Sequence, residues 1–299
     1  MGLPVGDVRG DLELRRHDAS RPASERRQAP GDAKATPGAL FFSVRRVPPG
    51  PPVDGSHRRA RPRRLCRVTK DQVEARLAEV TERIEAAARR AGRRASDVEI
   101  LPVTKGHPAG GIEIVKALGV GRIGENRVPE AEAKRLELGP TPGVAWHLIG
   151  RLQRNKARRA VRLFDVVESV DSVRLAGTLN RIVEEERREP VEVLVQVNTS
   201  GEAAKAGLGP DVALDAVAEI CELPGLRVAG LMTMAPFTAD EAEVRPAFRG
   251  AARLLKRCRA EIPDFEGKAL SMGMSNDFEI AIEEGSTRVR LGTVLLGER

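Results

Sequence analysis

The stretch VEVLVQVN, residues 191–198, decides the fold class of this chain. Its apolar residues run almost without a break and show little strict alternation with polar residues. Strands of a parallel sheet are covered on both faces, so they read as nearly continuous apolar runs. The stretch therefore predicts a buried strand in a parallel sheet that has helices packed on it.

Seven other short runs, apolar or rich in β-branched residues, are typical of strands, and helical patterns separate them. The first helical pattern places Val73, Leu77, Val80 and Ile84 on one face and stops at Gly92. Alternation of this kind over roughly 230 residues fits an α/β fold, a single (β/α)8 TIM-type barrel, better than an open sheet. The eight predicted strands span 98–103, 122–124, 146–150, 164–170, 191–198, 226–232, 268–272 and 287–292.

Residues 1–66 differ in composition from the rest of the chain. They hold nine of the 20 prolines and, with fourteen basic against seven acidic residues, the whole formal charge of +7. We interpret them as a disordered Arg/Pro/Gly-rich extension, or as a misassigned start with Val68 as the initiator. The barrel domain is then 67–299. Its charges balance, which argues against a nucleic-acid footprint on the folded part.

Targeting and metal signals are weak. The seven acidic residues of the extension argue against a mitochondrial leader. No apolar run approaches the roughly 18 residues of a membrane span. We therefore expect a cytoplasmic protein with neither a membrane nor a nucleic acid as partner. The cysteines and histidines have no metal-type spacing, so we expect no metal site; they are Cys66, Cys221, Cys258, His17, His57, His107 and His147.

Lys105 stands at the C-terminal end of the first predicted strand. Active sites of such barrels gather at this end, and phosphate sites commonly form from the loops after strands seven and eight. We expect Ser275 to begin a helix whose positive end favours an anion. A lysine facing a phosphate cradle predicts a phosphorylated aldehyde held as a Schiff base. The expected cradle residues are Gly273, Ser275, Gly292 and Thr293.

Each of these residues also has a structural interpretation. On the local sequence alone, Lys105 is better explained as a strand-end lysine that reaches solvent. Ser275 fits an ordinary helix N-cap. Gly292 fits a strand end, and Arg290 a structural ion-pair partner. The functional interpretation depends on their occurring together.

Six blocks of the sequence resemble the signature blocks of the YggS/PROSC family of pyridoxal 5′-phosphate (PLP) homeostasis proteins. These proteins are single barrels built like the N-terminal domain of alanine racemase, and the resemblance covers about residues 70–299. It implies that Lys105 forms the Schiff base with PLP and that Arg290 faces the pyridine nitrogen. It also implies that Ser275, Gly292 and Thr293 contact the phosphate and that Asn126 lines the pocket. The blocks are LPVTKGHP, GENRVPEA, WHLIGRLQRNKAR, VLVQVNTSGEAAKAG, LRVAGLMTM and LSMGMSNDFEIAIEEGSTRVRLGTVLLGER.

Four residues of these blocks leave questions open. His147 and Lys156 belong to the family motifs, but their chemical role does not follow from the sequence. Arg127 and Pro129 stand where the family commonly reads GENYVQE, in a loop near the cofactor. We expect the two replacements to affect cofactor exchange or a partner.

The resemblance implies a carrier that buffers PLP and delivers it to PLP-dependent apoenzymes, rather than an enzyme. An arginine beside the ring nitrogen can only donate hydrogen bonds, so it favours an unprotonated pyridine and a poorer electron sink. Alanine racemase takes a second acid or base, a tyrosine, from a separate C-terminal domain, whereas this chain has no tyrosine. Without that domain, which racemase dimers use, we expect a monomer and no catalytic residue.

Three alternatives stay open. One is a PLP-dependent amino-acid racemase or lyase with a reduced active site, in which His107 or His147 serves as the second acid or base. Another is a cofactor-free class I aldolase on the same barrel. The last is a binding module whose basic extension associates with nucleic acid or an anionic membrane in a salt-sensitive way.

Overall fold

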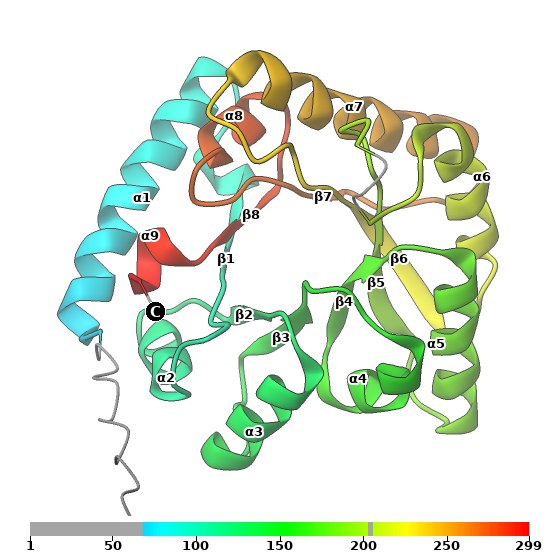
Figure 1. Ribbon diagram of the computed structural model, residues 1–299, viewed down its shortest axis with the longest axis horizontal. Coiled ribbons are helices and arrows are strands. Elements are labelled where there is room, and N and C mark those ends of the chain that lie inside the picture. Colours follow the sequence, from blue (N-terminus) through cyan, green and yellow to red (C-terminus); the bar gives the residue numbers. More distant parts are fainter. Residues whose placement is uncertain (1–67, 203–205, 299) are drawn as a thin grey trace, which may run out of the picture. The chain divides into compact units, whose positions relative to one another are not determined.

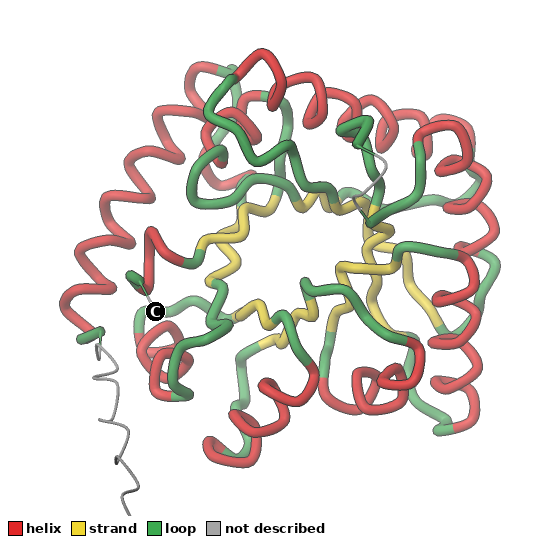
Figure 2. Tube along the Cα trace, viewed as in Figure 1, coloured by secondary structure: helices red, strands yellow, loops and turns green. Residues whose placement is uncertain are grey.

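A computed structural model describes residues 68–202 and 206–298 of the chain, so the predictions for residues 1–66 lie outside the described residues. In the described part, strands form an inner ring and helices surround it (Figures 1 and 2). The strands are β1 (Glu99–Pro102), β2 (Arg122–Glu125), β3 (Ala145–Leu148), β4 (Val166–Val170), β5 (Val191–Gln196), β6 (Leu226–Met232), β7 (Ala269–Ser271) and β8 (Arg288–Leu291). The α-helices are α1 (Lys70–Arg90), α2 (Gly110–Ala117), α3 (Val128–Leu138), α4 (Ala157–Leu163), α5 (Val173–Glu185), α6 (Pro210–Cys221), α7 (Glu241–Glu261), α8 (Phe278–Glu283) and α9 (Thr293–Leu296), with short 3-10 turns η1 (Ala95–Asp97) and η2 (Arg154–Lys156).

All strand pairs are parallel, and the sheet order is β1-β8-β7-β6-β5-β4-β3-β2. The two ends of this order meet where Val103 bridges to Gly124 and the Thr104 amide donates to the Gly124 carbonyl at 3.0 Å. The sheet is therefore a nearly closed barrel. Each of the eight predicted strands is confirmed, including the short run 122–124, and VEVLVQVN supplies β5.

The helix α1 shows how the sequence sets one element. Thr69 and Gln72 form a capping box: the Thr69 hydroxyl accepts from the Gln72 amide, and the Gln72 side chain accepts from the Thr69 amide. Val73, Val80 and Ile84 are buried on the inner face. In Figure 1, α1 runs alongside α8 and α9. None of the helices in the described residues is both long enough and apolar enough to cross a membrane.

Buried charged and polar side chains lie inside the barrel. Glu168 of β4 lies at 0% exposure, and its two oxygens reach across the barrel to different strands. Oε2 accepts from Ser271 Oγ of β7 at 2.6 Å, and Oε1 from Arg288 Nη1 of β8 at 3.0 Å. His147 Nδ1 of β3 lies 2.8 Å from Oε1. Because β4 and β8 are not neighbours, these contacts tie opposite walls of the barrel together.

Candidate cofactor site

A cavity of about 870 Å³ opens at the C-terminal ends of the strands. Such a volume is within the range of small-molecule sites. The segments after β1, β2, β3, β6, β7 and β8 contribute to its lining. It brings together the six residues that the family resemblance implies for PLP: Lys105, Asn126, Ser275, Arg290, Gly292 and Thr293.

A buried ion-pair network contacts the residues on either side of Lys105. Lys134 of α3 is 6% exposed, and its Nζ donates to Glu125 Oε1 at 2.6 Å and to the Thr104 carbonyl at 2.7 Å. It also lies 3.0 Å from Glu130 Oε1. Glu125 is fully buried, and burial raises its pKa more than the neighbouring Lys134 and Thr104 lower it. Within the described residues, Glu125 Oε2 has no hydrogen-bond partner.

The same network fixes the backbone on both sides of Lys105. Before it, Thr104 donates its hydroxyl to Glu125 at 2.5 Å and offers its carbonyl to Lys134. After it, the Gly106 amide donates to Glu130 Oε1 at 2.5 Å. Sequence reasoning missed this network, because charges spaced along α3 look like those of an ordinary solvated helix face.

Arg290 is 4% exposed and is held by neutral acceptors. Its Nη1 donates to Ser271 Oγ at 2.8 Å and its Nη2 to the Thr233 carbonyl at 2.8 Å. No carboxylate in the described residues forms an ion pair with it, so the ion-pair interpretation of Arg290 is wrong. Burial lowers the pKa of the guanidinium, although arginine stays protonated in proteins.

Glu168 orients Arg290 through the Ser271 hydroxyl that both contact. Burial by itself would raise the pKa of Glu168 above its ordinary value. The hydrogen bond from His147 and the charges of His147, Arg288 and Arg290 outweigh burial and hold this pKa at about 2. The carboxylate is therefore ionised at neutral pH, and through Ser271 it holds Arg290 in place at the cavity.

The prediction that Ser275 begins a helix is wrong. Residues 275–277 form a turn, closed by the Asp277 amide donating to the Met274 carbonyl at 3.1 Å, and α8 starts only at Phe278. The N-cap interpretation of Ser275 fails for the same reason. Its hydroxyl instead accepts from the Val294 amide at 3.5 Å. The turn thus directs Ser275 to the segment after β8, where Gly292 and Thr293 lie.

Gly273 does not belong to the described lining of the cavity, contrary to expectation. Its φ is +92°, and a Cβ there would lie 2.6 Å from Ala281 Cβ and 2.9 Å from Phe278 Cα. Glycine is needed at this position because the backbone turns tightly against α8. Its role is to bring β7 into the turn that carries Ser275.

Several lining residues were not predicted. The segment after β6 contributes Met234 and Phe237, and Phe237 is 88% exposed. Asp277 also lines the cavity and is 7% exposed, and its burial raises its pKa despite the Met274 amide. Met234 and Asp277 lie in the quoted family blocks, but the sequence predicted no role for them. Phe237 lies in no quoted block, and only its position after a predicted strand could have indicated it.

The two described histidines do not line the cofactor cavity. Neither His107 nor His147 is among its described lining residues, and His147 is buried beside Glu168. His17 and His57 lie outside the described residues, as does Cys66. In the part of the chain that the structure describes, no three His, Cys, Asp or Glu side chains gather as they would around a metal ion.

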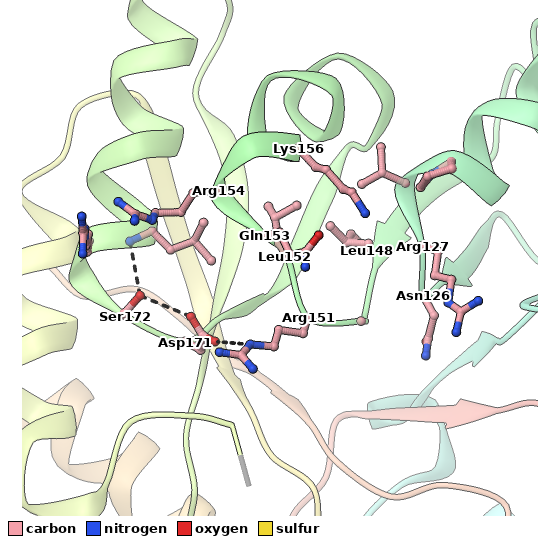
Figure 3. A pocket seen from close by; sticks show the side chains of 15 residues that line it. Asn126, Arg127, Leu148, Arg151, Leu152, Gln153, Arg154, Lys156, Asp171 and Ser172 are labelled. Carbon is pink, nitrogen blue, oxygen red and sulfur yellow. Dashed lines mark hydrogen bonds and ion pairs between the residues drawn. The ribbon is translucent and has the colours of Figure 1, made fainter. Parts of the chain in front are cut away.

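Three residues with open roles line a second cavity instead. Arg127, Pro129 and Lys156 lie in a cavity of about 760 Å³ that shares Asn126 with the first (Figure 3). Gly150 lines it too, and a Cβ there would overlap with the backbone of Asn126. Glycine thus lets the segment after β3 pass close to the end of β2.

Comparisons with known proteins identify the family. The family model for the alanine racemase N-terminal domain matches residues 76–299. The pyridoxal phosphate homeostasis protein of Mycobacterium tuberculosis H37Rv is 41% identical over 240 residues, which cover 75% of this chain and 91% of that protein. The chain belongs to the pyridoxal phosphate homeostasis protein family. The family member from Pseudomonas aeruginosa is also 41% identical, over 75% of this chain and 94% of its own length.

Solved structures share the fold. PipY of Synechococcus elongatus is 37% identical and covers 75% of this chain and all of its own. Its TM-score is 0.68 without PLP and 0.66 with PLP bound. Alanine racemase of Clostridium difficile, at 19% identity and a TM-score of 0.59, shares the fold and covers 77% of this chain but only 57% of its own.

Proposed function

We propose that this chain binds PLP covalently through Lys105 and serves in PLP homeostasis. The observation that carries the proposal is the convergence of Lys105, Arg290, Ser275, Gly292 and Thr293 on one cavity. The PLP-bound structure of PipY and the names of the curated relatives support it. The lysine is half-buried at the end of a strand whose backbone the Glu125–Lys134–Glu130 network fixes.

The donor set fits a phosphorylated pyridine aldehyde. When bound, PLP supplies an aldehyde carbon that a lysine amine can hold through a reversible covalent bond. The hydroxyls of Ser275 and Thr293 and the backbone at Gly292 are neutral donors suited to phosphate oxygens, and hydrogen bonds to charged groups are the stronger kind. Lys105 lies in the same cavity and provides the amine.

Arg290 lines the cavity and stays protonated, so it can only donate hydrogen bonds to a ligand there. Its two hydrogen bonds fix the guanidinium, and the Ser271 hydroxyl that accepts one of them donates to the ionised Glu168. A group that can only donate leaves a facing ring nitrogen unprotonated. This disfavours chemistry that needs a fully delocalised carbanion, and we therefore infer a carrier rather than an efficient enzyme.

A reduced racemase or lyase activity is the second candidate. Asp277 favours it, because this carboxyl lines the cavity and burial raises its pKa, which makes it a possible proton donor. Delivery of PLP to apoenzymes, the cytoplasmic location and the monomeric state stay predictions of the sequence.

Absorbance spectroscopy with a racemisation assay tests the proposal. Wild type and Lys105→Ala are incubated with PLP and freed of unbound cofactor by gel filtration. We expect wild type to keep a visible absorbance band that the variant lacks, and neither sample to racemise amino acids. Retention of the same band by Lys105→Ala would overturn the assignment of the lysine. Turnover that Asp277→Asn abolishes would establish the second candidate instead.

A further inference from the structure

The second cavity is built from three segments that follow neighbouring strands. Its volume is about 760 Å³, and it shares only Asn126 with the described lining of the cofactor cavity. Figure 3 shows its polar side chains arranged around a common space, with Leu148 and Leu152 near the middle of the view. The segments are residues 126–129 after β2, 150–156 after β3 and 171–175 after β4.

Its described lining is strongly cationic. Five basic side chains contribute, against the single carboxylate of Asp171. Arg151 Nε lies 3.6 Å from Asp171 Oδ2, which leaves the other four basic residues. Among the described residues, none of those four has a carboxylate within ion-pair distance. They are Arg127, Arg154, Lys156 and Arg174.

The neighbouring helix α4 shows that this arrangement is not general. Three arginines on α4 all have glutamate partners. Arg158 pairs with Glu185 and Glu186, Arg159 with Glu132, and Arg162 with Glu186. The arginines of α4 are thus paired with glutamates, whereas four of the five basic side chains around the cavity have no carboxylate partner among the described residues. Like charges gathered around one space repel each other, and a bound anion would offset that repulsion.

Two helix N-termini add to the positive potential. Arg127 is the N-cap of the 11-residue α3, and Ser172 is the N-cap of the 13-residue α5. The Ser172 hydroxyl already accepts from the Leu175 amide at 3.3 Å and donates to Asp171 at 3.2 Å. The basic side chains rather than the α5 amides are thus the main donors to an anion in the cavity. The two helix N-termini add to the positive potential of these side chains.

We propose that this cavity binds a small polyanion that carries phosphate groups. Arginine forks match phosphate oxygens in two-point contacts, and the cavity has the size of a metabolite site rather than of a protein interface. The arginines are exposed, so solvent and salt screen them and binding is reversible and salt-sensitive. Lys105 does not line this site, which adjoins the cofactor cavity at Asn126.

Calorimetric titration with pyrophosphate tests the proposal. Protein preincubated with PLP is used, so that the phosphate cradle near Ser275 does not take up the probe. The test variant is Arg154→Gln/Lys156→Gln, which removes two unpaired cations. The matched control is Arg158→Gln/Arg159→Gln, which removes two paired cations from the adjacent helix. Thermal unfolding of both variants verifies that they fold.

We expect pyrophosphate to bind wild type and to bind the test variant about tenfold more weakly, since hydrogen bonds to charged groups are the strong ones. The control should stay within roughly twofold of wild type, because its two arginines are paired with glutamates and do not line the cavity. If pyrophosphate affinity fell equally in both variants, the effect would come from the loss of net positive charge, and the proposal would be overturned. Absence of pyrophosphate binding would overturn it as well. If a glutamate-rich peptide then bound in a way that Arg154→Gln/Lys156→Gln abolished, the cavity would be a protein-docking site instead.

Discussion

The two cavities at the C-terminal end of the barrel are similar in volume and share Asn126, but they hold their charges differently. Around the cofactor cavity, charged groups are buried and fixed by partners, as Lys134 is by Glu125 and Arg290 by Ser271. Around the second cavity, arginines are exposed and, among the described residues, four of five basic groups lack a carboxylate partner. A buried charge needs an opposite charge or hydrogen-bond acceptors, because burial without either is costly. The first cavity is thus preorganised for one ligand, whereas the second suits reversible exchange.

The substitution Lys134→Met should break the fixed cavity most severely. It leaves Glu125 buried without its cation, and removal of one partner from a buried pair costs about 3–5 kcal/mol. Urea unfolding measures the loss. Lys116→Met, at an exposed lysine of α2, is the control and should change the free energy of unfolding by less than about 0.5 kcal/mol. Similar losses in the two variants would contradict the network's role.

Acid should weaken the other buried network. The pKa of Glu168 is about 2 in the folded protein against an ordinary value of 4.5. A lowered carboxyl pKa stabilises the fold above its unfolded value, so the contribution is lost as the pH falls from about 4.5 to 2. The loss is about 3 kcal/mol. Unfolding of wild type and Glu168→Gln across this range measures it; the gap between them should narrow as the pH falls, and a constant gap would contradict the assignment.

Removal of one cradle hydroxyl should have an intermediate effect. We expect Ser275→Ala to lower PLP affinity roughly tenfold, because a hydrogen bond to a charged group is lost. Equilibrium dialysis of PLP provides the measurement. Thr178→Ala, whose hydroxyl donates to the Arg174 carbonyl on the outside of α5, is the control and should bind as wild type does. Unchanged affinity in Ser275→Ala would remove this residue from the cradle.

The smallest effect is expected at the second cavity. Arg154 is exposed and has no carboxylate partner among the described residues. Arg154→Gln should therefore leave the free energy of unfolding within about 0.5 kcal/mol of wild type, as is usual for surface substitutions. Urea denaturation compares the two. A loss above about 1 kcal/mol would show that the arginine is a structural residue and would remove the contrast between the cavities.

Part of this arrangement could be predicted from the sequence. Buried parallel strands leave continuous apolar runs, so β5 and its neighbours were found and Lys105 was placed at a strand end. The barrel topology then brings the ends of β1, β7 and β8 to one face, which is why Arg290 and Thr293 line the same cavity as Lys105.

The parts that escaped prediction depend on contacts between distant segments. Ser275 was given to a helix because a serine before NDFEIAIEEG resembles an N-cap, whereas the chain first makes a turn. Lys134 looked like a surface residue, since nothing local shows that it reaches Thr104, 30 residues away. The second cavity could not be predicted even though most of its cations lie in the quoted blocks, because they come from three segments that only the fold brings together.

Reductive trapping tests the central claim most directly. The protein is incubated with PLP, reduced with borohydride, digested and mapped by mass spectrometry. The account predicts stoichiometric pyridoxyl label on Lys105 and none on Lys156, which lies in the second cavity. Label on Lys156, or label spread over exposed lysines with Lys105 unmodified, would contradict it.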